Sequence, residues 1–289
     1  MLIVFNPIAG RRRAALLWRV LDVLVANGVR LDLMETNRAG HAEELARDAV
    51  ARGLPMVVAA GGDGTIAEVA NGLMGSTVAL GVIPLGTANV LAHELALPFA
   101  PRAVAAALAF GRTQQIWPGL AQREGTTRLF VQMLGAGFDA HVVHTLPFPL
   151  KRMFGRGAYV MQTLRELTRY GYDPISLRLD GQDMQAASVI VSKGRLYGGH
   201  YLLAPDAQPQ EPGFSVVLFE KADPGRTLMY GAALPLNRLG RAPGVRHMRA
   251  SRIEFIGNYP APVQADGDKA GFLPLTVLNA PHPIRIVVG

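Results

Sequence analysis

Short apolar runs alternate with longer amphipathic segments from the first residue to about residue 115. The runs have strand length, and the segments between them repeat apolar residues at helical spacing. This alternation is typical of a parallel sheet with helices on its faces, an α/β domain. The pattern predicts strands at residues 2–5, 29–34, 56–60 and 78–82, and helices at residues 14–26, 42–51, 66–73, 90–95 and 101–109.

Beyond residue 115 the pattern changes to short alternating strands separated by Gly and Pro turns. Such spacing predicts a second, mainly antiparallel β-sandwich domain, interrupted by one helix at residues 157–170. A prior of roughly 150 residues per domain also gives two domains for this length. We therefore expect an α/β domain at residues 1–116 and a β-rich domain at residues 117–289. Strands of the second domain are expected at residues 129–133, 175–179, 187–191, 214–219, 253–256 and 284–288.

Composition narrows the classes of protein that fit this pattern. With 49% hydrophobic and 18% charged residues the chain can bury a core, and the lack of cysteine excludes disulfides, thiolate metal sites and a cysteine nucleophile. The beginning of the chain has no signal-peptide zones, and every apolar run is far shorter than the roughly 20 residues that span a bilayer. A net charge of +7 favours anionic partners. The composition predicts a cytoplasmic protein.

The strongest local motif is Gly61-Gly62-Asp63-Gly64-Thr65, which joins an expected strand to an expected helix. Glycines let backbone amides approach a polyphosphate, and the helix N-terminus attracts negative charge. A carboxylate beside phosphates needs compensation by a cation, a ribose hydroxyl or a proton transfer, so Asp63 indicates more than a turn. The simpler alternative is a strand-to-helix turn in which Asp63 serves as a cap.

Two further turns end neighbouring strands. Pro84-Leu85-Gly86-Thr87-Ala88-Asn89 follows the strand at 78–82, and Asn6-Pro7-Ile8-Ala9-Gly10 with three arginines follows the first strand. Strand ends of a parallel sheet share an edge, so these loops should face one cleft. Thr87 could donate to phosphate, and Asn89 could cap the next helix or orient the loop. Ordinary Pro/Gly turns and a solvated basic loop are the alternatives.

In this order the motifs resemble the diacylglycerol kinase catalytic domain family, which includes bacterial lipid kinases and the sphingosine and ceramide kinases. The resemblance continues through Gly135-Ala136-Gly137-Phe138-Asp139-Ala140 and Ala204-Pro205-Asp206-Ala207. It ends with Asp266-Gly267-Asp268, where the family usually has Asp-Gly-Glu. It therefore covers nearly the whole chain.

The resemblance implies a two-domain fold of the NAD kinase and diacylglycerol kinase type, with ATP and Mg²⁺ in the cleft and a lipid entering from the β-rich domain. It implies that Asp63 organises magnesium and phosphate, and that Asp268 is the general base with Asp266 in support. The aspartate at 268 is one methylene shorter than the family's glutamate. The implied nucleotide contacts are Asn6, Thr36, Gly61, Gly62, Asp63, Gly64, Thr65, Ile66, Ala67, Thr87 and Asn89.

The chain departs from the family pattern at three places. Val90 stands where many bacterial members have aspartate, and Trp117-Pro118-Gly119 replaces an Asp-x-Gly. The family's accessory divalent-ion site would fall within residues 208–214, where only Glu211 has a carboxylate. These departures keep open a regulator that binds nucleotide or lipid without catalysis. NAD kinase, which shares the Gly-Gly-Asp-Gly-Thr loop, is a second alternative.

Residues 146–156 mix apolar and basic side chains, as a membrane-surface element does. A loop that packs its apolar residues into the second domain is the alternative. Taken together, the sequence predicts a lipid kinase of phospholipid biosynthesis that is cytoplasmic and peripherally bound to anionic membrane. Its expected partner is the lipid substrate, with no nucleic acid, and a homodimer is compatible with the sequence.

Overall fold

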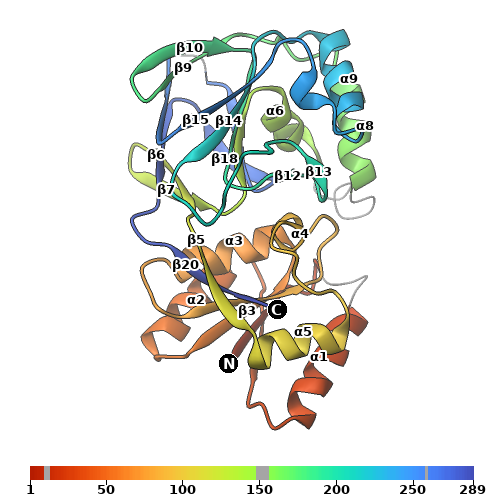
Figure 1. Cartoon of the computed structure of the whole chain (residues 1–289), viewed down its shortest axis with the longest axis vertical. Coiled ribbons are helices and arrows are strands. Elements are labelled where there is room, and N and C mark those ends of the chain that lie inside the picture. The colour runs from red at the N-terminus through yellow and green to blue at the C-terminus, as the bar shows by residue number, and fades with distance from the viewer. Residues whose placement is uncertain (10–13, 148–155, 258–259) are drawn as a thin grey trace. The chain divides into compact units, whose positions relative to one another are not determined.

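The computed structural model describes residues 1–9, 14–147, 156–257 and 260–289 (Figure 1). The chain forms two compact units, one of Met1–Trp117 with Pro281–Gly289 and the other of Pro118–Ala280. Each unit has its own sheet system and its own buried core.

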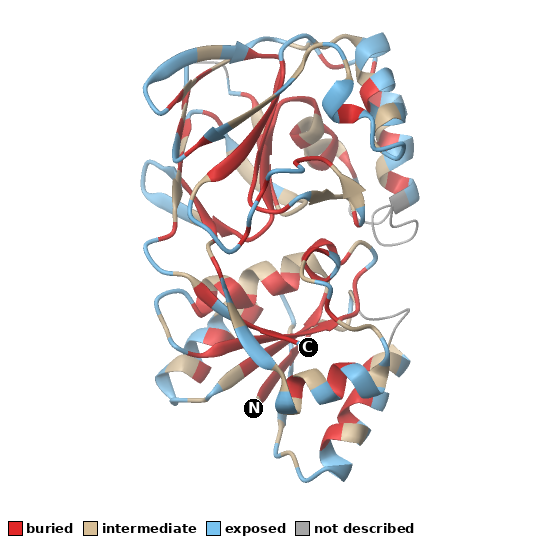
Figure 2. Cartoon of the chain, viewed as in Figure 1, coloured by how far each residue is buried: buried red, intermediate tan, exposed pale blue. Residues whose placement is uncertain are grey.

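The first unit contains a six-stranded sheet in the order β2-β1-β3-β4-β20-β5. Neighbouring strands are parallel except for β5, which runs antiparallel to β20. Strands β1, β3 and β4 are buried along almost their whole length (Figure 2), as expected where helices cover both faces of a parallel sheet. The strands are β1 Leu2–Phe5, β2 Asp32–Glu35, β3 Met56–Gly61, β4 Ala79–Pro84, β5 Arg112–Ile116 and β20 Ile284–Val288.

Two pairs of helices cover this sheet. Helices α1 (Ala14–Ala26) and α5 (Pro101–Phe110) pack on each other and on the face that carries Ile3 and Val58. Helices α2 (His41–Ala51) and α3 (Asp63–Gly72) pack together and contact β1 and β3. This second pair approaches closely at Gly72, where a Cβ would lie 2.4 Å from a backbone oxygen of α2. A short helix, α4 (Val90–Glu94), follows β4.

The second unit is an antiparallel sandwich of two six-stranded sheets with a two-stranded sheet beside them. The sheet orders are β10-β9-β16-β19-β6-β7 and β15-β14-β11-β8-β17-β18, with β12-β13 as the small sheet. The helices are α6 (Phe138–Thr145), α8 (Arg156–Glu166), α9 (Pro224–Ala233) and a 3₁₀ turn at Leu239–Arg241. The strands are β6 Gly119–Arg123, β7 Thr126–Phe130, β8 Met133–Ala136, β9 Ile175–Leu179, β10 Gln182–Ala186, β11 Ser188–Ser192, β12 Leu196–Tyr197, β13 Tyr201–Leu202, β14 Phe214–Phe219, β15 Val245–Ala250, β16 Arg252–Ile256, β17 Pro262–Ala265, β18 Asp268–Phe272 and β19 Leu275–Asn279.

This architecture confirms the predicted fold class and corrects two details. Strand β20 was expected in the β-rich domain, but it joins the first sheet, where Ile286 pairs with Leu80 of β4 and the whole strand pairs with β5. Its apolar pattern predicts a strand but contains no information about the partner. The run at residues 129–133 belongs to two strands, β7 and β8, because Val131 and Gln132 between them are not in strand conformation.

Among the described residues, no helix is both long enough and apolar enough to cross a bilayer.

Candidate active site

The order of strands in the first sheet marks a ligand site. Strands β2 and β3 lie on opposite sides of β1, so the chain reverses its direction across the sheet between β1 and β3. Ligands of open α/β sheets bind outside the carboxyl ends of the strands at such a switch point. Asn6 follows β1 there, and Gly61-Gly62 ends β3. The topology thus selects two of the turns that the sequence singled out.

A side-chain hydrogen bond joins these two turns. The Asn6 Nδ2 donates to Thr65 Oγ1 over 3.0 Å, while Asn6 Oδ1 accepts from the backbone N–H groups of Ile8 and Ala9. Because Asn6 donates, the Thr65 hydroxyl keeps its own hydrogen for another acceptor. A Cβ at residue 61 would lie 2.5 Å from Thr65 Oγ1, so Gly61 is needed for this approach.

The third turn packs against the glycine pair. The backbone N–H groups of Leu85 and Gly86 donate to Gly61 O over 2.9 and 3.1 Å. A Cβ on Gly86 would lie 2.6 Å from the Cα of Gly62 and 2.7 Å from Asn89 Oδ1. The two loops can therefore meet only through glycines. Thr87 is exposed at the tip of this loop, where its hydroxyl is accessible.

The side chain of Asn89 holds the loop by hydrogen bonds to its backbone carbonyls. It has a left-handed backbone with φ 48°, and its Nδ2 donates to Gly86 O over 2.9 Å and to Pro84 O over 3.4 Å. It occupies the N-cap position of α4 but makes no side-chain capping bond. Of the two roles considered for Asn89, the structure supports orientation of the loop.

Asp63 is the first residue of α3, and its half-buried carboxylate lies against the start of α4. Its Oδ1 accepts from the backbone N–H of Leu91 over 3.3 Å. Burial raises the pKa of Asp63 to about 6, although backbone N–H groups of Leu91 and Val90 lower it in part. A carboxylate that is costly to ionise alone is stabilised by a bound cation.

The remaining predicted nucleotide contacts lie around these loops. The backbone N–H of Thr36 donates to Phe5 O over 2.8 Å, which places Thr36 at the same sheet edge as Asn6. Gly64 and Ala67 are half-buried in the first turns of α3. Ile66 is fully buried and its N–H donates to Gly62 O, so it packs the core beneath the loop.

In the second unit, Asp266 and Gly267 form the two-residue turn between β17 and β18. Both have positive φ, 50° and 82°, as a tight hairpin turn requires, and Ala265 pairs with Asp268. The Asp266 carboxylate accepts the backbone N–H groups of Val131, Gln132 and Met133 over 2.8, 2.8 and 2.9 Å. Asp266-Gly267 thus forms a tight Asp-Gly turn, whose carboxylate is anchored by the backbone between β7 and β8.

These bonds separate the roles of the two acids. Both oxygens of Asp266 are engaged by backbone donors, so Asp266 holds the turn in place. Asp268 follows as the first residue of β18 and is half-buried. The geometry therefore favours Asp268 over Asp266 as a group that could exchange a proton with a substrate.

A buried network supports this turn from the other side. Gln264 Oε1 accepts from Gly267 N over 2.8 Å, and Gln264 Nε2 donates to Asp139 Oδ2 over 2.9 Å. The Tyr197 hydroxyl donates to the other oxygen of Asp139. Burial raises the pKa of both Asp139 and Tyr197. A Cβ at Gly135 would lie 2.7 Å from Asp139 Oδ2, which explains the glycine of that motif.

The sequence motifs did not identify three residues of this arrangement. Gln264 and Tyr197 belong to the network, and the hydroxyl of Tyr159 on α8 donates to Gly267 O over 3.3 Å. Gln264 gave one usable signal, because a polar residue between Val263 and Ala265 interrupts a buried strand. The two tyrosines lie in no motif.

Among the described residues, no group of three or more His, Cys, Asp or Glu side chains is placed to hold an ion. Within residues 208–214, the carbonyls of Glu211 and Gly213 accept from the buried Lys193 Nζ over 2.8 and 2.7 Å. Desolvation lowers the pKa of Lys193 to about 8. Mg²⁺ is usually bound by one or two carboxylates together with substrate phosphates, and Asp63 fits that pattern.

Two sequence predictions fall largely on residues outside the described ranges. They are Gly10 with the arginines at 11–13, and most of the segment at 146–156.

Family models and known proteins match both units of the chain. Residues 1–120 match the model of the diacylglycerol kinase catalytic domain, and residues 132–288 match the YegS C-terminal NAD kinase beta sandwich-like domain. The chain is 27% identical to a diacylglycerol kinase of Bacillus subtilis, over 99% of this chain and 95% of that one. It is 30% identical to a YegS-like chain of Xanthomonas euvesicatoria, named a probable lipid kinase, over 86% of this chain and 83% of that one.

A solved diacylglycerol kinase structure from Bacillus anthracis has the same fold. Its TM-score is 0.75 at 20% identity, with coverage of 100% of this chain and 96% of that chain. The family models account for both units, so the chain belongs to the family of diacylglycerol kinases and YegS-like lipid kinases. The family resemblance inferred from the motifs is confirmed.

Proposed function

We propose that the protein is an ATP-dependent lipid kinase that transfers the γ-phosphoryl group to a lipid hydroxyl. The observation that carries this proposal is the contact between Gly62 and Gly86 at the switch point of the sheet. Two loops that meet only through glycines fix the N-terminus of α3 at this edge, and the first backbone N–H groups of a helix, which have no intrahelical acceptor, suit close binding of a polyphosphate.

The first unit would bind the nucleotide. Amides at the start of α3 and the hydroxyls of Thr65 and Thr87 would contact phosphate oxygens. Asp63 would hold the accompanying cation, and Mg²⁺ would neutralise charge on the phosphates when bound. Asn6 fixes the hydroxyl of Thr65, so the loop is organised before the nucleotide arrives.

The second unit would supply the base. The lipid oxygen attacks the γ-phosphorus, the bond to the bridging oxygen breaks, and ADP leaves with that oxygen. The proton of the lipid hydroxyl would pass to the carboxylate of Asp268. Asp266 and Gln264 act as positioning residues, because they hold the turn that carries Asp268.

The acceptor would be a membrane lipid of diacylglycerol or sphingoid type. The Bacillus subtilis relative is named a diacylglycerol kinase, so diacylglycerol is the first acceptor to test. We place the protein in the cytoplasm in peripheral contact with anionic membrane, serving phospholipid biosynthesis. The net charge of +7 supports that contact.

Mass spectrometry of lipids from cells that overproduce the protein tests this proposal. A lipid class that gains one phosphate in wild-type cells, but not in cells producing Asp63→Asn, is the expected result. The same extracts should be searched for NADP, whose rise without a phosphorylated lipid would indicate a small-molecule kinase. Binding of ATP by the purified protein with no phosphorylated product of either kind would indicate a regulator without catalysis.

A further inference from the structure

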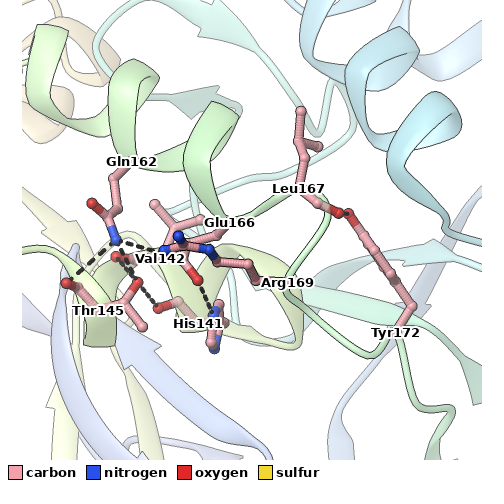
Figure 3. Close-up of polar contacts among 8 residues, drawn as sticks. All are labelled: His141, Val142, Thr145, Gln162, Glu166, Leu167, Arg169 and Tyr172. Carbon is pink, nitrogen blue, oxygen red and sulfur yellow. Dashed lines mark hydrogen bonds and ion pairs between the residues drawn. The ribbon is translucent and has the colours of Figure 1, made fainter.

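Helix α8 buries two polar side chains and exposes three apolar ones. Its inner side carries Gln162 and Glu166, both buried against α6 (Figure 3). Glu166 Oε2 lies 3.0 Å from His141 Nε2, and Gln162 Nε2 donates to Glu166 Oε1 and to Thr145 Oγ1 over 3.1 Å. Hydrogen bonds therefore hold this side of the helix to the domain.

The outer side of α8 is apolar. Val160, Met161 and Leu164 are 61%, 52% and 55% exposed. Residues at positions i, i+1 and i+4 lie on one side of a helix, so these three form a continuous stripe. A surface helix normally turns such a stripe toward the core, and contiguous exposed apolar side chains indicate an interaction surface.

Helix α9 repeats this arrangement. Leu228 is 55% exposed and Met229 is 37% exposed, and Ala232 completes the same spacing. The Tyr172 hydroxyl donates to Leu167 O, directly after α8, over 2.9 Å. Both helices lie along one side of the second unit (Figures 1 and 2). We call the five side chains Val160, Met161, Leu164, Leu228 and Met229 the α8–α9 surface.

Positive charges outnumber negative ones around the α8–α9 surface, where Asp223 at the N-cap of α9 pairs with Arg226 and Asp173 is exposed beyond α8. In residues 157–171 and 224–241 the exposed charged side chains are all arginines, and the acidic Glu166 is buried. An exposed apolar stripe flanked by arginines complements a bilayer with anionic headgroups. The excess of arginine favours an anionic bilayer over a second copy of the chain, whose own arginines would repel these. The flanking arginines are Arg165, Arg169, Arg226, Arg238 and Arg241.

We propose that the α8–α9 surface docks the protein on a bilayer that contains anionic phospholipid, with its apolar side chains in the boundary between headgroups and acyl chains. This inference rests on the proposed function, since it supplies the site at which the enzyme meets a membrane-bound acceptor. Tyr159, on the inner side of α8, donates to Gly267 O over 3.3 Å. The docking helix is thus attached to the turn that carries Asp268.

Vesicle binding of Leu164→Asp and Leu228→Asp tests the docking surface. Sedimentation with vesicles of phosphatidylcholine and phosphatidylglycerol, without nucleotide, should show that each variant binds at least about tenfold more weakly than wild type, since burial of one leucine side chain changes a partition constant by that order. Phe110→Asp is the matched control, because Phe110 is 83% exposed at the end of α5 in the first unit and should leave binding unchanged. Wild-type binding should weaken in phosphatidylcholine alone and at high salt.

Three results would overturn the docking surface: no binding of wild type to mixed vesicles, wild-type binding by Leu164→Asp and Leu228→Asp, or an equal loss in Phe110→Asp. Sedimentation velocity without lipid adds one more, since a dimer that Leu164→Asp dissociates while vesicle binding persists would assign the surface to a second copy. The binding assay needs no phosphoryl transfer. Loss of vesicle binding in the variants therefore supports the α8–α9 surface even if no lipid is phosphorylated. Absence of lipid phosphorylation would contradict only the proposed function.

Discussion

Replacing Asp266 with Asn should loosen the turn between β17 and β18 without changing its shape. The wild-type carboxylate accepts three backbone N–H groups, two at Oδ1 and one at Oδ2. An asparagine oxygen can keep the bonds from Gln132 and Met133, but its NH₂ group would face the N–H of Val131. Asparagine tolerates the φ of 50° at this position, so backbone strain adds little.

The size of this effect follows from the lost bonds. A hydrogen bond to a charged acceptor contributes about 1.5–3 kcal/mol, and a bond to a neutral acceptor contributes about 1 kcal/mol. Losing one charged bond and weakening two gives about 3 kcal/mol, or about a hundredfold in an opening equilibrium. Hydrogen exchange of peptides that cover residues 131–133 measures this opening directly, and we expect exchange about a hundredfold faster.

Asp268→Asn is the matched comparison. It should leave exchange at residues 131–133 near the wild-type rate and lower kcat by about 10²- to 10⁴-fold, as loss of a general base does. The KM for ATP should change little. If Asp266→Asn abolished turnover with unchanged exchange, while Asp268→Asn kept the wild-type kcat, the base would have been assigned to the wrong carboxylate.

Three more substitutions test other parts of the site. Gly86→Ala should weaken ATP binding by at least about tenfold in calorimetry, because its Cβ would meet Gly62 at 2.6 Å, whereas Gly231→Ala in open space should not. The pKa of Asp63 is raised from 3.8 to about 6, so kcat/KM for Mg-ATP should rise as the pH increases through about 6. The Asp63→Asn variant should show no such rise and almost no turnover. Without nucleotide, this raised pKa should make wild-type stability fall as pH rises from 3.8 to about 6, and a flat difference from Asp63→Asn would contradict the shift. Lys193 has a pKa lowered from 10.5 to about 8, so wild-type stability relative to Lys193→Met, measured by thermal unfolding, should rise between these pH values; a fall would show that the ammonium is favoured in the folded state.

Local patterns predicted the elements that depend on local forces. The strands at residues 2–5 and 214–219 and the helix at residues 14–26 occur with the predicted bounds, because apolar periodicity determines each of them. Partners distant in sequence decided the rest. The apolar run at 129–133 is interrupted because the carboxylate of Asp266, 135 residues further along the chain, accepts the N–H of Val131. The final strand was recognised, but its place beside β4 depends on the assembled sheet.

The candidate site shows the same division. Glycines and the loop aspartate identified the loops after β3 and β4 in the sequence, because a close approach of backbones requires glycine. The two loops were expected at one sheet edge, and the structure brings them into contact at Gly62 and Gly86. The support of the second turn is barely visible in the sequence, because Tyr197 is an ordinary polar residue in no motif and Gln264 shows only as a polar residue within a buried strand.

Transfer of a radiolabelled γ-phosphate tests the central claim most directly. Purified protein is incubated with labelled ATP, Mg²⁺ and vesicles that contain diacylglycerol, and the lipids are then extracted into organic solvent. The account predicts label in a phosphorylated lipid with wild type, with at least about a hundredfold less for Asp268→Asn. Label that appears only as inorganic phosphate or in NADP, with none in the lipids of any acceptor class supplied, would contradict it.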